Sequence, residues 1–150
     1  MDIGHSVLAI ALGVQLYGLG TIWLVQLVVY PLFGKVGADE YTTYHRFYTS
    51  RIPLPVIVPG FLSFFLPVAV LAFLPDSVPV WLAVANVIMG LVGLAVTVGL
   101  EIPRHGKLER DGKNDKLIAE LIAFNWPRTA SITASAALTV AMAMKAFVPG

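Results

Sequence analysis

The chain has 150 residues, of which 57% are hydrophobic and only 13% carry a charge. A soluble domain has about 25% charged residues, and so short a chain cannot hide this much apolar surface from water. The composition therefore excludes an ordinary water-soluble domain and predicts a membrane protein with a single domain, residues 1–150. The net charge of +1 predicts no nucleic-acid partner, and the absence of cysteine excludes disulfides, thiolate metal sites and cysteine nucleophiles.

Four stretches are long enough to cross the bilayer core, which needs roughly 20 apolar residues in a helix. The predicted spans cover about residues 6–31, 52–74, 78–100 and 129–148, and an amphipathic segment over about 115–124 precedes the fourth. The runs do not alternate, and open strands leave backbone groups unsatisfied in lipid. We therefore expect an all-α integral membrane four-helix bundle. Asn125 is expected to cap the fourth helix, with Pro127 near its first positions.

Lysine and arginine gather at one end of the predicted bundle. Nine of them lie in the first and third connections and at the start of the fourth helix, whereas the other end holds only Lys145. The positive-inside rule places the basic end in the cytoplasm. The protein is therefore predicted to lie in the bacterial inner membrane with both termini on the non-cytoplasmic side. The nine residues are Lys35, Arg46, Arg51, Arg104, Lys107, Arg110, Lys113, Lys116 and Arg128.

Small and polar residues form two stripes that suit close helix packing in lipid. Their spacing of three and four residues places each set on one helix face. We interpret both stripes as packing surfaces, with a ligand path along the fourth helix as the alternative. The third helix carries Ala83, Asn86, Gly90, Gly93 and Thr97, and the fourth carries Ser131, Ser135 and Thr139.

Prolines interrupt the second predicted helix. Pro59 and Pro67 lie inside it, and each removes one helical hydrogen bond, which frees the carbonyls of Pro55 and Ser63. A bend at these positions either opens a pocket or solves a packing problem.

The first predicted helix carries polar residues on one face. Gln15 and Gln26 are close to three turns apart, and Tyr30 follows one turn later. A buried amide in lipid needs a partner. We expect interhelical hydrogen bonds, with a polar pocket wall formed by Gln26 and Tyr30 as the alternative.

Two histidines, His45 and His105, lie on the two basic connections. Histidine acts as a proton shuttle or a metal ligand, but neither residue has a second histidine three or four positions away, so no metal site is predicted. We expect interfacial histidines, with proton transfer or a role as haem ligand as the functional alternatives.

Arg51, Trp126 and Arg128 are predicted to lie where the chain enters the bilayer. A central arginine costs on the order of 3 kcal/mol or more, so we expect headgroup anchoring for both arginines. The alternative is an anionic ligand or an ion pair, for which Glu101 and Glu120 are candidate partners.

A few short motifs carry a resemblance over nearly the whole chain. They are Gln26, Tyr30-Pro31-Leu32-Phe33, Arg51-Ile52, Pro59 and Asn125-Trp126-Pro127-Arg128-Thr129. Together they resemble a family of small uncharacterised bacterial four-helix membrane proteins that is distantly similar to the anthrone-oxygenase type. Where that family often has histidine, histidine and glutamate, this chain has Val29, Tyr48 and Ser63. The resemblance therefore implies that a metal or acid–base cluster at those positions is lost here.

Three functions follow as hypotheses. The first is a non-catalytic structural or accessory subunit, with other membrane subunits or a homo-oligomer as partners besides the lipid bilayer. The second, which the resemblance implies, is a membrane oxidoreductase or cofactor-free oxygenase for a hydrophobic aromatic substrate. The third is haem or quinone binding within the bundle, although no cofactor is predicted. We favour the first. Catalytic candidates are His105, Tyr30, Asn125 and Arg128, and ligand-binding candidates are Gln26, Tyr30, His45, Arg51, Trp126 and Arg128.

Overall fold

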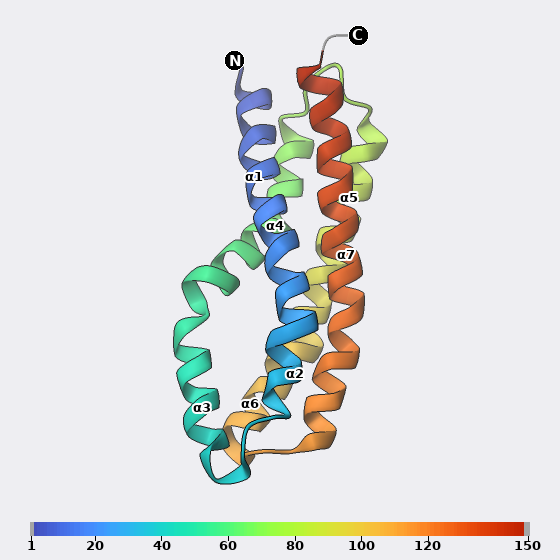
Figure 1. Cartoon of the computed structure of the whole chain (residues 1–150). Coiled ribbons are helices and arrows are strands. Elements are labelled where there is room, and N and C mark those ends of the chain that lie inside the picture. The colour runs from blue at the N-terminus through green and yellow to red at the C-terminus, as the bar shows by residue number, and fades with distance from the viewer. Residues whose placement is uncertain (1, 149–150) are drawn as a thin grey trace.

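The computed structural model describes residues 2–148, which are helical almost throughout and contain no strand. Four helical columns are long and apolar enough to cross a membrane, namely Ile3–Phe33, Pro53–Ala72, Val80–Asp111 and Asp115–Phe147. The prediction of an all-α membrane four-helix bundle is confirmed. The start of α1 and the end of α7 lie at the same end of the bundle, and α3 and α6 lie toward the other end (Figure 1). The elements are α1 (Ile3–Leu24), η1 (Val25–Val29), α2 (Tyr30–Phe33), α3 (Ala38–Arg51), η2 (Pro53–Ile57), α4 (Val58–Ala72), α5 (Val80–Val96), η3 (Thr97–Glu101), α6 (Ile102–Asp111) and α7 (Asp115–Phe147), where η denotes a π-helix.

The polar connections are themselves helical. The first connection contains α3, and the third is largely α6, which continues the column of α5 and η3 beyond the apolar run. Arg51 is consequently the last residue of α3 and is exposed, rather than the first residue of a membrane-spanning helix. In Figure 1 the ribbon of α3 lies at a distance from that of α2, but aromatic side chains fill the space between them: the Phe33 ring of α2 lies edge-on to Tyr44 and Tyr48 of α3.

The fourth column is one continuous helix, so the prediction that Asn125 caps it is wrong. Helix α7 begins at Asp115, because the Asn114 side chain accepts a hydrogen bond from the Leu117 amide at 3.0 Å. The predicted amphipathic segment is therefore the first part of this helix. Its apolar face, with Leu121 fully buried, packs into the core at the α3–α6 end. Pro127 removes a single backbone bond, which a helix of 33 residues tolerates.

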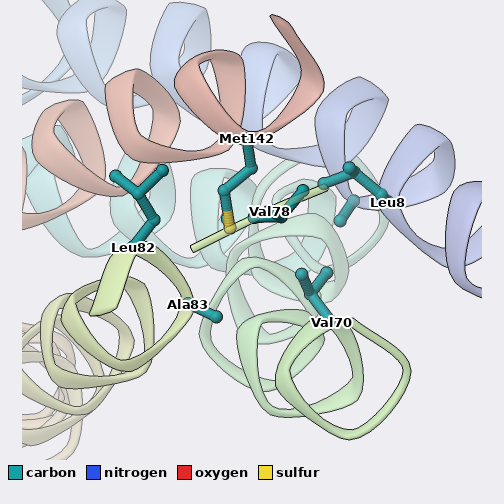
Figure 2. Close-up of a cluster of buried hydrophobic side chains, with 7 residues drawn as sticks. Leu8, Val70, Val78, Leu82, Ala83 and Met142 are labelled. Carbon is teal, nitrogen blue, oxygen red and sulfur yellow. The ribbon is translucent and has the colours of Figure 1, made fainter. Parts of the chain in front are cut away.

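Three apolar clusters stabilise the bundle at different heights. The cluster nearest the termini has Met142 reaching from α7 into its middle (Figure 2). A second cluster surrounds Phe33, Tyr41 and Leu108 at the other end, and a smaller one joins Ile22, Phe64 and Ile132 between them.

The small-residue stripe of the third span is buried as predicted, and it packs against α4 and α7. A Cβ on Gly90 would lie 2.8 Å from the Phe64 carbonyl oxygen, and one on Gly93 would lie 2.6 Å from the Phe64 ring. Asn86 donates to Thr139 Oγ1 at 3.0 Å and accepts a hydrogen bond from Ser135. The stripes therefore serve close packing and interhelical hydrogen bonding.

The two carbonyls freed by proline are both satisfied from α1. Gln15 Nε2 donates to the Ser63 carbonyl at 2.8 Å, and the Tyr17 hydroxyl donates to the Pro55 carbonyl at 3.0 Å. The interhelical bond predicted for Gln15 is thus present. These contacts hold α4 against α1 although its backbone ladder is interrupted.

Candidate functional site

A cavity of about 80 Å³ lies inside the bundle toward the α3–α6 end. It exceeds the roughly 10–15 Å³ that one water molecule needs. All three π-helices supply residues to its wall: η1 gives Val25, η2 gives Val56 and Ile57, and η3 gives Thr97 and Glu101. Such segments displace side chains from the regular helical register and are frequent at functional sites. Its polar lining consists of Tyr30, Tyr48, Thr97, Glu101, His105 and Arg128, and most of the remaining wall is apolar.

Glu101 and Arg128 place an acidic and a basic side chain on the cavity wall. The Glu101 side chain is 2% exposed; within residues 2–148 neither carboxyl oxygen has a hydrogen-bond partner within 3.5 Å, and the Tyr30 hydroxyl lies close enough to interact with the group more weakly. Arg128 is 8% exposed; its Nη1 donates to Asn125 Oδ1 at 3.3 Å, whereas its Nε has no partner among these residues. Glu120, the other predicted partner for an arginine, instead pairs with Arg104 at 3.3 Å.

A chain of hydrogen bonds leads from the cavity toward α3. The Tyr30 hydroxyl lies 3.1 Å from His105 Nε2, and His105 Nδ1 lies 3.1 Å from His45 Nε2. Both ring nitrogens of His105 are therefore engaged in hydrogen bonds, whereas His45 Nδ1 has no hydrogen-bond partner among residues 2–148. Successive groups of this kind, each both donor and acceptor, can pass a proton along the chain.

Burial sets the protonation of the α3 side chains in this cluster. It lowers the pKa of His45, and the nearby Glu109 carboxylate opposes that shift only in part. It raises the pKa of Tyr48 to about 12, against the opposing effect of Arg128. Removal from water disfavours the charged form in both cases, so a neutral imidazole and a neutral phenol face the site from α3.

A network of side-chain amides and one hydroxyl holds Arg128 in place. Asn125 Nδ2 donates to Gln26 Oε1 at 2.8 Å, and Thr129 Oγ1 donates to the same oxygen at 3.2 Å. Gln26 Nε2 in turn donates to the Ile122 carbonyl at 3.2 Å. Since Asn125 also holds the guanidinium of Arg128, this network fixes the position of the positive charge at the cavity.

The structure divides the predicted site residues into three groups. Tyr30, His105 and Arg128 line the cavity. Gln26, His45 and Asn125 are buried and hydrogen-bonded to residues that line it, or to one another. Arg51 and Trp126 lie outside: Arg51 stacks over Phe47, and Trp126 packs edge-on against Trp23 with nearly half its surface exposed.

Glu101 is the residue of the cavity that sequence reasoning considered only as an ion-pair partner. A signal for it was present, because Glu101 follows Thr97 by four residues and His105 follows Glu101 by four. Continuing the buried stripe of the third helix by these steps would have placed both side chains on the inner face. Tyr48 was noted only as a replacement for histidine, although it too lines the cavity.

Metal binding has no support in the geometry of the described residues. Between Asp2 and Val148, no group of three or more histidine, aspartate or glutamate side chains is placed to hold a metal ion.

Neither a protein-family model, nor a curated protein, nor a solved structure matches the chain.

Proposed function

We propose that the protein binds a lipid-soluble hydroxy-aromatic molecule, of the phenol or quinol class, in this cavity and exchanges a proton with it. The observation that supports this most strongly is the Glu101 carboxyl group, which is buried on the cavity wall with both oxygens unpartnered by residues 2–148. A buried polar group without a hydrogen bond costs about 1–3 kcal/mol. A hydroxyl group on a bound molecule would supply the missing donor.

The rest of the wall favours an amphipathic ligand over water alone. Phe61, Phe64 and Ile102 present apolar surface to the same space. Ligand pockets commonly combine such walls with a few convergent polar groups. An aromatic ring against the apolar wall, with its hydroxyl toward Glu101, matches both parts.

The chemistry available here is acid–base. A ligand hydroxyl that hydrogen-bonds to the Glu101 carboxylate can transfer its proton: the ligand O–H bond breaks, a new O–H bond forms on Glu101, and the charge moves to the ligand oxygen. Arg128 on the same wall stabilises that oxyanion. Tyr30, His105 and His45 form a chain of exchangeable protons beside the cavity, along which a proton can shift from the site toward α3.

This step is also the one that a cofactor-free oxygenase of an aromatic substrate would require first. The site therefore supports the oxygenase hypothesis more than the accessory-subunit hypothesis, which rests on the missing histidine and glutamate cluster and on the short loops. The accessory subunit stays a prediction, and blue-native electrophoresis from native membranes would test it. Migration as a lone chain or a small homo-oligomer would count against it.

The basic end of the bundle supports a location in the bacterial inner membrane with α3 and α6 toward the cytoplasm. Apart from Arg128, which is buried at the cavity, the nine basic residues counted for this end lie in or beside α3, α6 and the first turn of α7. The positive-inside rule then places both termini on the opposite side.

The test compares two ligands that share one ring system and differ in whether the oxygen carries a proton or a methyl group. Purified protein in nanodiscs is titrated with 1-naphthol and with 1-methoxynaphthalene, and binding to empty nanodiscs is subtracted. We expect protein-dependent binding of 1-naphthol that exceeds binding of the ether about 10-fold or more, since a hydrogen bond to a charged group contributes about 1.5–3 kcal/mol.

The matched variants are Glu101→Gln and Glu120→Gln. We expect Glu101→Gln to lose the preference for 1-naphthol and Glu120→Gln to keep it, because Glu120 pairs with Arg104 and does not line the cavity. Equal binding of the two ligands by the unmodified protein, or an unchanged preference in Glu101→Gln, would overturn the proposal.

A further inference from the structure

Three hollows lie in series from the polar cavity to the lipid-facing surface. The cavity shares Val25, Val56, Gly60 and Arg128 with a narrow passage of about 10 Å³ between α1 and α4. That passage shares Pro59 with an open groove of about 500 Å³ on the outer face of the same two helices. The groove lies entirely on helices that are apolar enough to span the membrane, so it faces lipid.

The sequence explains why this side of the bundle is open. On α1, Gly13 contributes no side chain to the groove and Gly18 contributes none to the passage. On the other wall, the π-helix η2 and Pro59 interrupt the regular helix just where the passage meets the groove. The Tyr17 hydroxyl donates to the Pro55 carbonyl at 3.0 Å, which links the two walls of the groove.

We propose that the groove holds the apolar tail of the molecule whose aromatic head occupies the cavity, and that the passage between them, which at about 10 Å³ is too small for a chain, widens when the tail enters. The ligand is thus a phenol or quinol that carries a single alkyl or isoprenoid chain and reaches the site sideways from the bilayer. This inference rests on the proposed function, because Arg128 and Glu101 must hold the head. Glu101 lines the cavity but not the passage, whereas Arg128 lines both, so a ring whose hydroxyl meets Glu101 extends from there toward the passage and carries its tail toward α1 and α4.

The tail contributes little to affinity. It moves from lipid to a groove that also faces lipid, and lipid chains compete for apolar helix surfaces. The proposal therefore predicts a steric effect: blocking the passage or the groove excludes a tailed ligand and spares a compact one with the same head.

The experiment uses 4-ethylphenol and 4-nonylphenol as competitors of 1-naphthol in nanodiscs, with each concentration corrected for partition into empty nanodiscs. Gly18→Val narrows the passage, since a Cβ at Gly18 already lies 3.8 Å from Ser63 Cβ. Gly13→Trp fills the groove from an exposed position with no neighbour within 4 Å. Gly20→Trp is the matched control, because Gly20 is also exposed on α1, has no neighbour within 4 Å and lines none of the three hollows.

We expect the unmodified protein and Gly20→Trp to bind both phenols. Gly18→Val and Gly13→Trp should each weaken the binding of 4-nonylphenol about 10-fold or more, which corresponds to about 1.4 kcal/mol. Neither variant should change the affinity for 4-ethylphenol. Unchanged binding of 4-nonylphenol in Gly13→Trp overturns the tail site while leaving the head site standing. Failure of the unmodified protein to bind 4-ethylphenol overturns the proposed function itself. If Gly18→Val does not fold, the comparison of 4-nonylphenol binding by Gly13→Trp and Gly20→Trp tests the tail site by itself.

Discussion

Asn125 shows how a single buried amide organises the polar interior. It is fully buried, it donates to Gln26, and it accepts from Arg128. Its removal leaves partners without hydrogen bonds in a region that water does not reach freely. The residue therefore links the stability of the bundle to the position of the charge at the cavity.

Asn125→Ala is expected to lower the free energy of unfolding by about 1–2 kcal/mol, a range that reflects the modest net value of hydrogen bonds within membranes. The measurement is unfolding by sodium dodecyl sulfate in mixed micelles, followed by circular dichroism. Ala130→Ser, at an exposed position of the same helix, is the control and should unfold like the unmodified protein. Equal stability of all three proteins would show that the hydrogen-bond network of Asn125 does not contribute to the free energy of unfolding.

His45 makes stability depend on pH. Because burial lowers its pKa in the folded protein, the unfolded chain binds the proton more tightly, with the ordinary value of 6.5. The stabilisation is therefore present above that value and is lost as the pH falls through it toward the folded pKa. We expect less stability at about pH 5 than at about pH 7.5, and a smaller difference in His45→Gln. An identical pH dependence in the variant would contradict this assignment.

At the scale of elements, the contact between α4 and α5 depends on the absence of side chains. A Cβ at Gly90 would meet the Phe64 backbone oxygen at 2.8 Å, and a backbone atom cannot turn away as a side chain can. Gly90→Ala should therefore destabilise the bundle by about 1–3 kcal/mol in the same unfolding assay.

Gly99→Ala is the matched control for this contact. Gly99 belongs to the same helical column but has no neighbour within 4 Å of an added Cβ. Alanine also favours helix more than glycine does, so this variant should be as stable as the unmodified protein or more stable. Greater damage from Gly99→Ala than from Gly90→Ala would refute the packing argument.

Most of the helices could be predicted from the sequence, because they follow from local patterns along the chain. The apolar runs identified four spans, and the stripe from Ala83 to Thr97 identified the inner face of the third helix. The start of α7 was missed because Pro127 suggested a break, whereas its extent depends on the Asn114 cap and on packing around Leu121.

The site was only partly predictable, for a different reason. Tyr30, His105 and Arg128 were predicted as catalytic candidates, but their convergence depends on three π-helices that no periodicity reveals. Arg51 and Trp126 are exposed because of the orientation of α3 and α7 about their axes, and the chemistry of an arginine or a tryptophan side chain does not predict that orientation.

For the whole molecule, the orientation in the membrane can be tested because the chain has no cysteine. Ser77→Cys places a thiol in the turn between α4 and α5, and Asp39→Cys places one in the first turn of α3; both positions are exposed. In intact cells, a membrane-impermeant maleimide should label Ser77→Cys and spare Asp39→Cys until the cells are lysed. The reverse pattern would contradict the orientation derived from the basic residues.

The central claim is that a ligand hydroxyl forms a hydrogen bond with the buried Glu101 carboxyl group inside the cavity. Infrared difference spectroscopy of the protein with and without 1-naphthol observes that carboxyl group directly. A carboxyl difference band should form with 1-naphthol, remain in Glu120→Gln, and be absent in Glu101→Gln and with 1-methoxynaphthalene. The same band in Glu101→Gln, or no carboxyl band in the unmodified protein at saturating 1-naphthol, would contradict the claim.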